Sequence, residues 1–287
     1  MRYCYKDFES EDKINEILNL YREGNSMVTV NKITENMYGI SRIATLIKER
    51  GLSRDNHEKS LKYSFNENFF DCIDTEEKAY WLGFIYADGY IANAIPGKIH
   101  DAFGMALSSV DEAHLEKFKK SLDSTHPIHY YTSAYGTGLS KITFVNQHFV
   151  DNLISKGVLR NKSLILTFPP YDIVPKKLTI HFIRGYFDGD GSIKKTGKRR
   201  TNAKDPYDVS ILGTKEFLEA LQNELGMHTK LKDASKHNVN NHEIVFGGYH
   251  KALSVLNLLY ENASIYLDRK YERYLELKNV RNSRLPQ

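Results

Sequence analysis

Four pairs of matched segments, each pair about 100 residues apart, limit the possible folds of this chain more than any other feature. The segment WLGFIYADGYI at 81–91 matches IRGYFDGDGSI at 183–193. Three more pairs follow in the same order: HLEKFKKSL (114–122) with FLEALQNEL (217–225), ITFVNQHFVDNLI (142–154) with IVFGGYHKALSVL (244–256), and LRNK (159–162) with LDRK (267–270). Each pair holds few identities, but their common order predicts two copies of one structural unit.

Both copies show the same succession of secondary structure. Each has a helix, extended segments, a second helix, two more extended segments and one or two closing helices. The extended segments include DAFGMALSS, SKITFVN, YDVSILG and HEIVFGG. This pattern predicts an α+β fold with antiparallel strands. We expect a first unit at 69–170 and a second at 171–287, joined near TFPPYDIVPKK and preceded by a polar linker at 53–68.

Residues 1–52 lie outside the repeat, and their sequence pattern predicts a small all-α module. Apolar residues recur at helical spacing in DKINEILNLYRE and again in GISRIATLIKERG. Three short helices with tight turns favour a helix-turn-helix, in which Arg42, Thr45 and Lys48 would face DNA. The alternative is a plain helical hairpin with a solvated face. Acidic and basic residues nearly balance here, so charge does not decide between the two.

The first matched pair predicts two buried helices that pack closely. In the first copy, Asp74 and Glu77 have the spacing of a capping box, and apolar residues then occupy every side of the helix. Small residues recur four apart in both copies: Gly83 and Ala87, then Gly185 and Gly189. Such residues share one helix face and allow two backbones to approach. The alternative is chance spacing in ordinary core helices, which the repetition disfavours.

An Asp-Gly pair ends each of these helices, at Asp88–Gly89 and Asp190–Gly191. We expect both glycines to adopt the left-handed conformation that ends many helices. A carboxylate at a helix C-terminus opposes the helix dipole by roughly 0.3–1 kcal/mol, and two neighbouring carboxylates also repel. A cation would remove both conflicts, and carboxylate and carbonyl oxygens suit Mg²⁺. The alternative is a simple turn in each copy, which the matched positions disfavour.

The segments WLGFIYADG and IRGYFDGDG resemble the two signature motifs of the LAGLIDADG homing endonucleases. The resemblance covers roughly residues 65–285. It implies two αββαββα units that form a saddle about a pseudo-twofold axis, with the motif helices at its centre. It also implies that Asp88 and Asp190 bind Mg²⁺, with Mn²⁺ as a substitute, and that each directs cleavage of one DNA strand. The carbonyl groups of Ala87 and Gly189 would assist.

The resemblance also bears on three further positions. The first acid of the motif is Asp188 in the second copy, whereas the first copy has Tyr86 there. Because this position is not the principal metal ligand in the family, we expect Asp188 to be structural or auxiliary. The family places a basic residue near the metals, and the repeat assigns that place to Lys162 and Lys270. They would polarise water or stabilise phosphate charge; the alternative is a surface lysine near a helix end.

A strongly basic segment follows the second motif. SIKKTGKRRTNAK at 192–204 holds six basic residues and no acid. A two-stranded ribbon fits the major groove, where lysines contact phosphates and arginines read guanine. The predicted DNA contacts are Ser192, Lys194, Lys195, Lys198, Arg199, Arg200 and Lys204, with Asn93 and Lys98 in the less basic counterpart of the first copy. The alternative is a solvated hairpin tip. The difference between the copies predicts a long, asymmetric target.

Composition excludes several classes of protein. Two cysteines, Cys4 and Cys72, make no disulfide framework, and no apolar run is long enough to span a membrane. The polar N-terminus does not have the pattern of a signal peptide. We therefore expect an intracellular, cytoplasmic protein, associated with the nucleoid or active in a phage-infected cell, with an organelle as the alternative. The net charge of +4 permits nucleic-acid binding without requiring it.

The residues and the resemblance together predict a monomeric, site-specific endonuclease that acts on double-stranded DNA. One alternative is a transcription regulator that uses the same fold with an added helix-turn-helix, and the presence of both motif acids argues against it. Another alternative is an intron RNA maturase, which shares the fold and can keep its acids.

Overall fold

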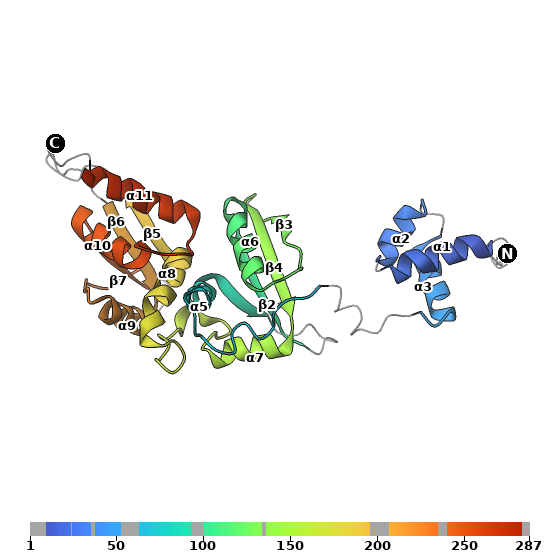
Figure 1. Ribbon diagram of the computed structural model, residues 1–287, viewed down its shortest axis with the longest axis horizontal. Helices are drawn as coiled ribbons and strands as arrows, with labels where there is room; N and C mark the ends of the chain where they lie inside the picture. Colours follow the sequence, from blue (N-terminus) through green and yellow to red (C-terminus); the bar gives the residue numbers. More distant parts are fainter. Residues whose placement is uncertain are drawn as a thin grey trace. The chain divides into compact units, whose positions relative to one another are not determined.

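The computed structural model describes residues 10–23, 25–35, 38–52, 63–92, 100–133, 136–195, 207–234 and 240–282. The chain divides into two compact units, Met1–Tyr63 and Ser64–Gln287 (Figure 1). The second unit begins inside the segment predicted as a linker. There the backbone N–H of Ser64 donates to Oγ1 of Thr125 at 2.8 Å, which ties the end of that segment to the second unit. Within the described ranges, no helix is long and apolar enough to cross a membrane.

In its described residues, the first unit has three short helices. They are α1 (Glu11–Arg22), α2 (Met27–Ile33) and α3 (Ile40–Glu49). Serines begin two of them: Ser10 Oγ accepts the N–H of Lys13, and Ser26 Oγ accepts the N–H of Thr29. The apolar residues at helical spacing form a core that belongs to this unit alone: Ile14, Ile17, Leu18, Tyr21, Val30, Ile43, Leu46 and Ile47. The unit therefore has its own hydrophobic centre.

The second unit contains two copies of one arrangement of helices and strands. The first copy consists of α5 (Glu76–Asp88), β1 (Gly89–Ala92), β2 (Ala102–Ser108), α6 (Glu112–Ser121), β3 (His129–Thr132), β4 (Gly138–Val145), α7 (Gln147–Ser155) and the 3-10 helix η3 (Lys162–Leu164). The second copy consists of α8 (Thr179–Asp190), β5 (Gly191–Lys195), β6 (Tyr207–Gly213), α9 (Lys215–Leu225), β7 (Lys232–Asp233), β8 (His242–Gly247), α10 (Tyr249–Tyr260) and α11 (Asp268–Asn282).

Each copy builds one four-stranded antiparallel sheet. The strand orders are β1-β2-β4-β3 and β5-β6-β8-β7, so strands in matched positions have matched neighbours. The registers also agree, because Gly89 pairs with Met105 in the first sheet and Gly191 pairs with Ile211 in the second. The predicted α+β fold of two pseudo-symmetric αββαββα units is confirmed.

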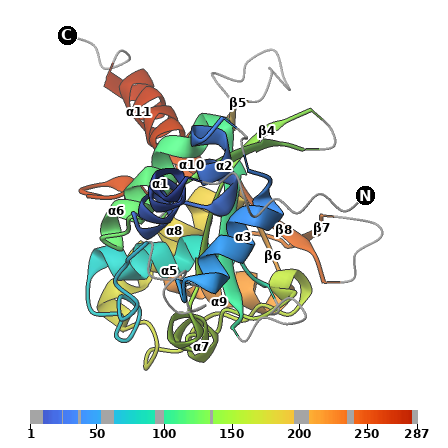
Figure 2. The ribbon, with the colours of Figure 1, turned by 90° about the vertical axis from the view of Figure 1, so that its right-hand side faces the viewer.

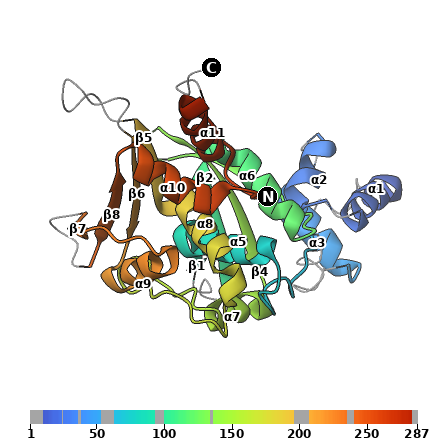
Figure 3. The same cartoon turned by 60° about the vertical axis from the view of Figure 1, so that its left-hand side comes forward.

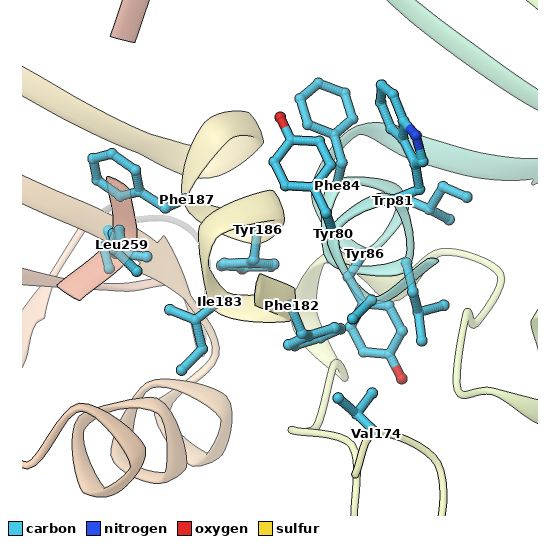
Figure 4. Packing of buried hydrophobic residues seen from close by; sticks show 14 of the residues in the cluster. Tyr80, Trp81, Phe84, Tyr86, Val174, Phe182, Ile183, Tyr186, Phe187 and Leu259 are labelled. Atoms are coloured by element: carbon cyan, nitrogen blue, oxygen red, sulfur yellow. The ribbon is translucent and has the colours of Figure 1, made fainter. Parts of the chain in front are cut away.

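The helices α5 and α8 pack against each other in the middle of the second unit, with one sheet on either side (Figure 1). Figure 2 shows the same two helices close together from another side. Both are buried all round, as the apolar residues of α5 predict (Figure 4). The start of α5 differs from the expected capping box. Thr75 is the N-cap and accepts the N–H of Lys78 at 3.2 Å, whereas Asp74 pairs with the ammonium of Lys78 at 2.9 Å.

One face of each sheet packs against helices. In Figure 3, α9 and α10 lie against one face of the second sheet, and no described helix lies on the opposite face. In the first sheet, Phe103 and Met105 of β2 are fully buried on the covered face. Lys141 of β4 alternates with buried neighbours and therefore points from the opposite face. Each sheet thus leaves one face free of described helices.

Candidate active site

Two glycines make the contact between α5 and α8. A methyl group at Gly83 would lie 1.9 Å from the carbonyl oxygen of Phe182, and one at Gly185 would lie 1.9 Å from the carbonyl oxygen of Tyr80. The contact is reciprocal, because these four positions match in the repeat. Glycine inside a helix costs on the order of 1 kcal/mol relative to alanine. Here it is required, because any side chain would collide with the backbone of the other helix.

The C-terminal ends of the two helices meet on the same face. A methyl group at Gly189 would lie 2.2 Å from Cβ of Ala87 and 3.0 Å from Oδ2 of Asp88. Asp88 and Asp190 are the last residues of α5 and α8, and both are half-buried. The structure therefore brings together the two aspartates and the two small residues that the sequence singled out.

The glycines that follow the aspartates differ from the expectation. Gly89 has φ −74° and ψ 152°, and Gly191 has φ −91° and ψ 165°. Both are extended and begin strands β1 and β5, so the left-handed conformation expected for them is wrong. Space explains the glycines: a methyl group at Gly191 would lie 2.1 Å from Cδ2 of Phe187, and one at Gly89 would lie 2.8 Å from Cγ2 of Ile85. Each aspartate is thus fixed at a direct junction of helix and strand.

A lysine reaches the end of each helix. Lys162, the first residue of η3, donates to the carbonyl oxygens of Ala87 (3.0 Å) and Gly89. Lys270, in the first turn of α11, is buried. It donates to four carbonyl oxygens, those of Phe187 (2.6 Å), Asp188 (2.7 Å), Gly189 (3.4 Å) and Gly191 (2.6 Å). The last carbonyl groups of a helix lack hydrogen-bond partners within it and carry the negative end of its dipole. An ammonium group therefore stabilises them both as a hydrogen-bond donor and as a positive charge.

Burial and mutual charge set the protonation of these groups. Burial, together with the nearby Asp190, raises the pKa of Asp88 to about 6. Burial also raises the pKa of Asp190, while the ammonium groups of Lys162 and Lys270 act against that rise. Burial lowers the pKa of Lys270 to about 8 and lowers that of Lys162 as well. Burial therefore weakens the charged form of the aspartates and of the lysines alike, and the opposite charges of the two kinds of group partly offset this.

A cavity of about 350 Å³ opens beside Asp190. Its lining includes Tyr86 and Ala87 from α5, Tyr186 and Asp190 from α8, and Lys162. Side chains of both copies thus share one space, in which the lysine of the first copy accompanies the aspartate of the second.

The oxygens at the two helix ends fit a hard divalent cation. Within the described part of the chain, no three His, Cys, Asp or Glu side chains form a metal cluster. A cation here would depend on Asp88, Asp190 and backbone carbonyl groups, an oxygen-only set with few protein ligands of the kind that Mg²⁺ accepts. The carbonyls of Ala87 and Gly189 already accept from the lysines, but each carbonyl oxygen has two acceptor sites. The raised pKa of Asp88 marks the negative charge that a cation would neutralise.

The first acid of the second motif lies in the core. Asp188 is 1% exposed, and its carboxylate accepts hydrogen bonds from the hydroxyls of Tyr80 (2.7 Å) and Tyr260 and from the backbone N–H of Leu267 (2.8 Å). Its counterpart Tyr86 donates to a backbone carbonyl instead.

Sequence reasoning missed a buried polar cluster that joins α5 to α8. Arg184, 2% exposed, donates to Oε1 of Glu76 at 2.6 Å and to two backbone carbonyl groups. Nε2 of His114 lies 3.0 Å from the hydroxyl of Tyr80, and burial lowers the pKa of His114 to about 3. A signal for Arg184 was present, because an arginine inside an apolar helix is buried only when it is paired. The partner, 108 residues away, had no such signal.

The structure describes part of the predicted DNA-binding set. Lys194 is exposed and Ser192 half-buried, and both lie on the face of β5 that helices leave free. Lys195 lies on the other face, where it pairs with buried Tyr207. The remaining residues of this set lie outside the described ranges: Asn93, Lys98, Lys198, Arg199, Arg200 and Lys204.

In the first unit, the three predicted contact residues follow one another at intervals of three along α3. Thr45 and Lys48 are exposed and Arg42 is half-buried. Nη1 of Arg42 lies 3.8 Å from Oε2 of Glu49, and the hydroxyl of Thr45 donates to the carbonyl oxygen of Ser41 at 3.0 Å. The three side chains therefore lie along one side of the helix.

Residues 178–267 match the family model of the LAGLIDADG-like domain. A variant of I-SmaMI has a TM-score of 0.50 at 12% identity, and the match covers 72% of this chain and 92% of that one. The meganuclease I-SmaMI bound to uncleavable DNA has a TM-score of 0.49 at 13% identity, with coverage of 70% and 89%. The I-LtrWI LAGLIDADG homing endonuclease bound to target DNA has a TM-score of 0.47 at 13% identity, with coverage of 73% and 92%. No curated protein sequence matches the chain. Residues 178–267 are therefore similar to the LAGLIDADG-like domain, and the unit that contains them has the fold of I-SmaMI.

Proposed function

We propose that the protein is a site-specific endonuclease that hydrolyses both strands of double-stranded DNA. One observation carries the proposal: Asp88 and Asp190 end two helices that are packed in register, and a lysine reaches each helix end. Two matched sets of acid and lysine suit two strands that a pseudo-twofold axis relates. Because one chain holds both sets, we infer that it acts as a monomer. The fold of I-SmaMI, a meganuclease that has been crystallised on DNA, supports the proposal.

The proposed cofactor is Mg²⁺, with Mn²⁺ as a substitute. Four residues would supply its protein ligands: the carboxylates of Asp88 and Asp190 and the carbonyl oxygens of Ala87 and Gly189. Such a cation would supply Lewis acidity and lower the pKa of a bound water. Lys162 and Lys270 would stabilise the charge that develops on the phosphate oxygens, because both ammonium groups are held at the same helix ends.

The DNA-binding surface that we propose consists of the helix-free faces of the two sheets. On the second sheet this face carries Ser192 and Lys194. On the first sheet it carries Lys141, whose ammonium lies 5.3 Å from the ring centre of Tyr90, and His129, which pairs with Lys141. Ammonium groups on this surface would contact phosphates and make binding depend on salt. Different side chains on the two faces favour an asymmetric target.

We further propose that the first unit contacts DNA through α3. Its own core makes it a separate module, and Arg42, Thr45 and Lys48 lie along one side of the helix. A helical unit with a merely solvated face is the alternative, and DNA affinity that does not change in Arg42→Ala or Lys48→Ala would establish it.

The test is cleavage of a randomised duplex library with Mg²⁺, followed by sequencing of the cut ends. We expect breaks at one defined sequence, and no breaks with EDTA or in the double variant Asp88→Asn/Asp190→Asn. Specific DNA binding without breaks would replace the proposal with a transcription regulator. Selective binding of a structured intron RNA would replace it with a maturase.

A further inference from the structure

One matched pair of residues lies in the last turn of the two buried motif helices, two residues before the aspartate that ends each helix. Asp188 and Tyr86 are 102 residues apart and occupy the same place in the two copies. Their chemistry differs, since one is a carboxylate that accepts and the other a hydroxyl that donates. Both nevertheless bind backbone groups in the segment that leads to the lysine of their own copy.

In the second copy, Asp188 holds the start of α11. Its Oδ2 accepts the N–H of Leu267 at 2.8 Å. The carbonyl oxygen of Leu267 in turn accepts the N–H groups of Lys270 (3.0 Å) and Tyr271 (3.1 Å), which are the first hydrogen bonds of the helix. Leu267 is itself buried. The carboxylate therefore fixes the N-terminus of the helix whose first turn carries Lys270.

Two tyrosines hold this carboxylate in place. Tyr80 donates to it from α5 and Tyr260 donates to it from α10. All three side chains are essentially inaccessible to water. Asp188 thus links both motif helices to the element that carries Lys270, and its orientation is determined by three donors.

In the first copy, Tyr86 holds the segment that leads to Lys162. Its hydroxyl donates to the carbonyl oxygen of Lys156 at 2.6 Å, at the C-cap of α7. The next residue, Gly157, has φ +92°, and a methyl group there would lie 2.1 Å from the hydroxyl of Tyr86. Positive φ and lack of space both require glycine at this turn. Buried Val158 follows, and the chain then reaches Lys162, which lines the same cavity as Tyr86.

We propose that Asp188 and Tyr86 are positioning residues, one for each lysine, and that each thereby controls the cleavage of one DNA strand. The proposal rests on the endonuclease function proposed above and deepens it. A catalytic ammonium works only when the segment that carries it is held to within a fraction of an ångström. The two copies meet this need at the same position with opposite hydrogen-bonding roles.

The test uses the full-length chain and its cleavage site in a duplex whose two strands carry different labels, so that each strand is timed separately. Lys162→Met and Lys270→Met define which strand depends on which lysine. Tyr86→Phe should slow the strand that Lys162→Met slows, and Asp188→Leu should slow the strand that Lys270→Met slows. We expect each effect to be about 10- to 100-fold. Asp188→Asn keeps an oxygen for the N–H of Leu267 and should restore part of the rate.

Tyr249→Phe is the matched control. It also removes a tyrosine hydroxyl that donates to a backbone carbonyl, that of Leu277 at 3.3 Å, about two turns beyond Lys270 in α11. Both strands should then be cut at the parent rate. If Asp188→Leu does not fold, Asp188→Asn and Tyr86→Phe decide the question.

The inference is wrong if Tyr86→Phe and the Asp188 variants slow the same strand, or slow both strands equally, while melting temperature and DNA affinity stay at parent values. The endonuclease function would survive that result. A parent chain that cuts neither strand would instead remove the function and the inference together.

Discussion

The motif helices of the two copies differ at several inner positions, among them Leu82, Phe84 and Tyr86 in the first, where the second has Arg184, Tyr186 and Asp188. Around these positions the backbone is alike, with the same strand order, reciprocal glycine contacts and a lysine on each helix end. In the second copy, Arg184 pairs with Glu76 and Asp188 accepts three hydrogen bonds, all inside the core. In the first copy, aromatic packing and a single hydroxyl replace that network.

This difference distinguishes the groups that the two copies share at the helix ends from the buried side chains that hold those groups in place. Both copies need a helix end, a carboxylate and a lysine in one arrangement, and backbone contacts supply this in both. The support behind the arrangement is ionic in one copy and mostly apolar in the other. Removing one partner of a buried ion pair typically costs 3–5 kcal/mol, so the pair of Arg184 with Glu76 makes the contact between the two copies depend on side chains as well as on backbone.

The largest expected effect comes from the two aspartates. Asp88→Asn and Asp190→Asn should each slow hydrolysis of one strand by at least roughly 10²–10³-fold, because each removes charge needed at one scissile phosphate. The affected strands should be opposite, as measured by strand-resolved cleavage kinetics. If both variants stop the same strand, the two copies do not serve one strand each.

The next effect concerns stability and pH. The pKa of Asp88 is raised to about 6 from an ordinary 3.8. At a pH between these two values, the carboxyl group of Asp88 binds a proton in the folded state and not in the unfolded state. Without metal, the free energy of unfolding should therefore rise as pH falls from 6 towards 4, and stay lower above 6. Asp88→Asn should gain up to roughly 3 kcal/mol at pH 7 and lose the part of this dependence that Asp88 contributes, whereas Asp190, whose pKa burial also raises, keeps its own part.

Urea unfolding with EDTA at pH 7.5 and pH 5 measures this effect. Mg²⁺ should stabilise the parent at pH 7.5 more than it stabilises Asp88→Asn, since the cation replaces the proton. Parallel pH profiles for parent and variant would contradict the assignment.

A smaller, symmetric effect is expected at the central glycines. Gly83→Ala and Gly185→Ala each place a methyl group 1.9 Å from a carbonyl oxygen, so each should lose roughly 1–3 kcal/mol of stability through overpacking. Thermal or urea unfolding measures both. Gly247→Ala is the control, because its nearest neighbour is the side-chain oxygen of Asp208 at 3.2 Å. Clearly unequal losses at the two glycines would break the symmetry of the contact.

The smallest effect distinguishes the two faces of β5. Lys194→Ala should weaken DNA binding and reduce the slope of log affinity against log salt by about 1, because one phosphate contact is lost. Lys141→Ala should do the same on the first sheet. Lys195→Ala removes an equal charge from the opposite face and should leave the slope unchanged. Equal slopes for Lys194→Ala and Lys195→Ala would show that a lysine contributes equally to DNA binding from either face of the sheet.

Most of the fold could be predicted from the sequence because it depends on repetition. Two matched series of helical and alternating patterns require matched sheets, and small residues four apart require a close helix contact. The same spacing predicted that Asp88 and Asp190 would meet, because each aspartate comes directly after a small residue of the contact face, Ala87 or Gly189.

The remainder of the site depends on contacts that no local pattern reveals. Gly89 and Gly191 read equally well as left-handed caps or as residues without room for a side chain, and only the packed neighbours decide. The pairing of Arg184 with Glu76 joins residues 108 positions apart. The link from Asp188 to the N–H of Leu267 depends on how the turn between α10 and α11 folds back onto α8.

The reciprocal contact of Gly83 and Gly185 has a consequence for how such a chain can change. It is an isologous interface, the kind that joins two identical subunits, here enclosed in one polypeptide. Each glycine meets the other helix at a peptide carbonyl and not at a side chain. At this contact the junction recognises main chain, whereas the hydrogen bonds of Arg184 with Glu76 and of Tyr80 with Asp188 join the same helices through side chains. A half exchanged at this junction would therefore have to present the same glycine and carbonyl and also supply these side-chain partners.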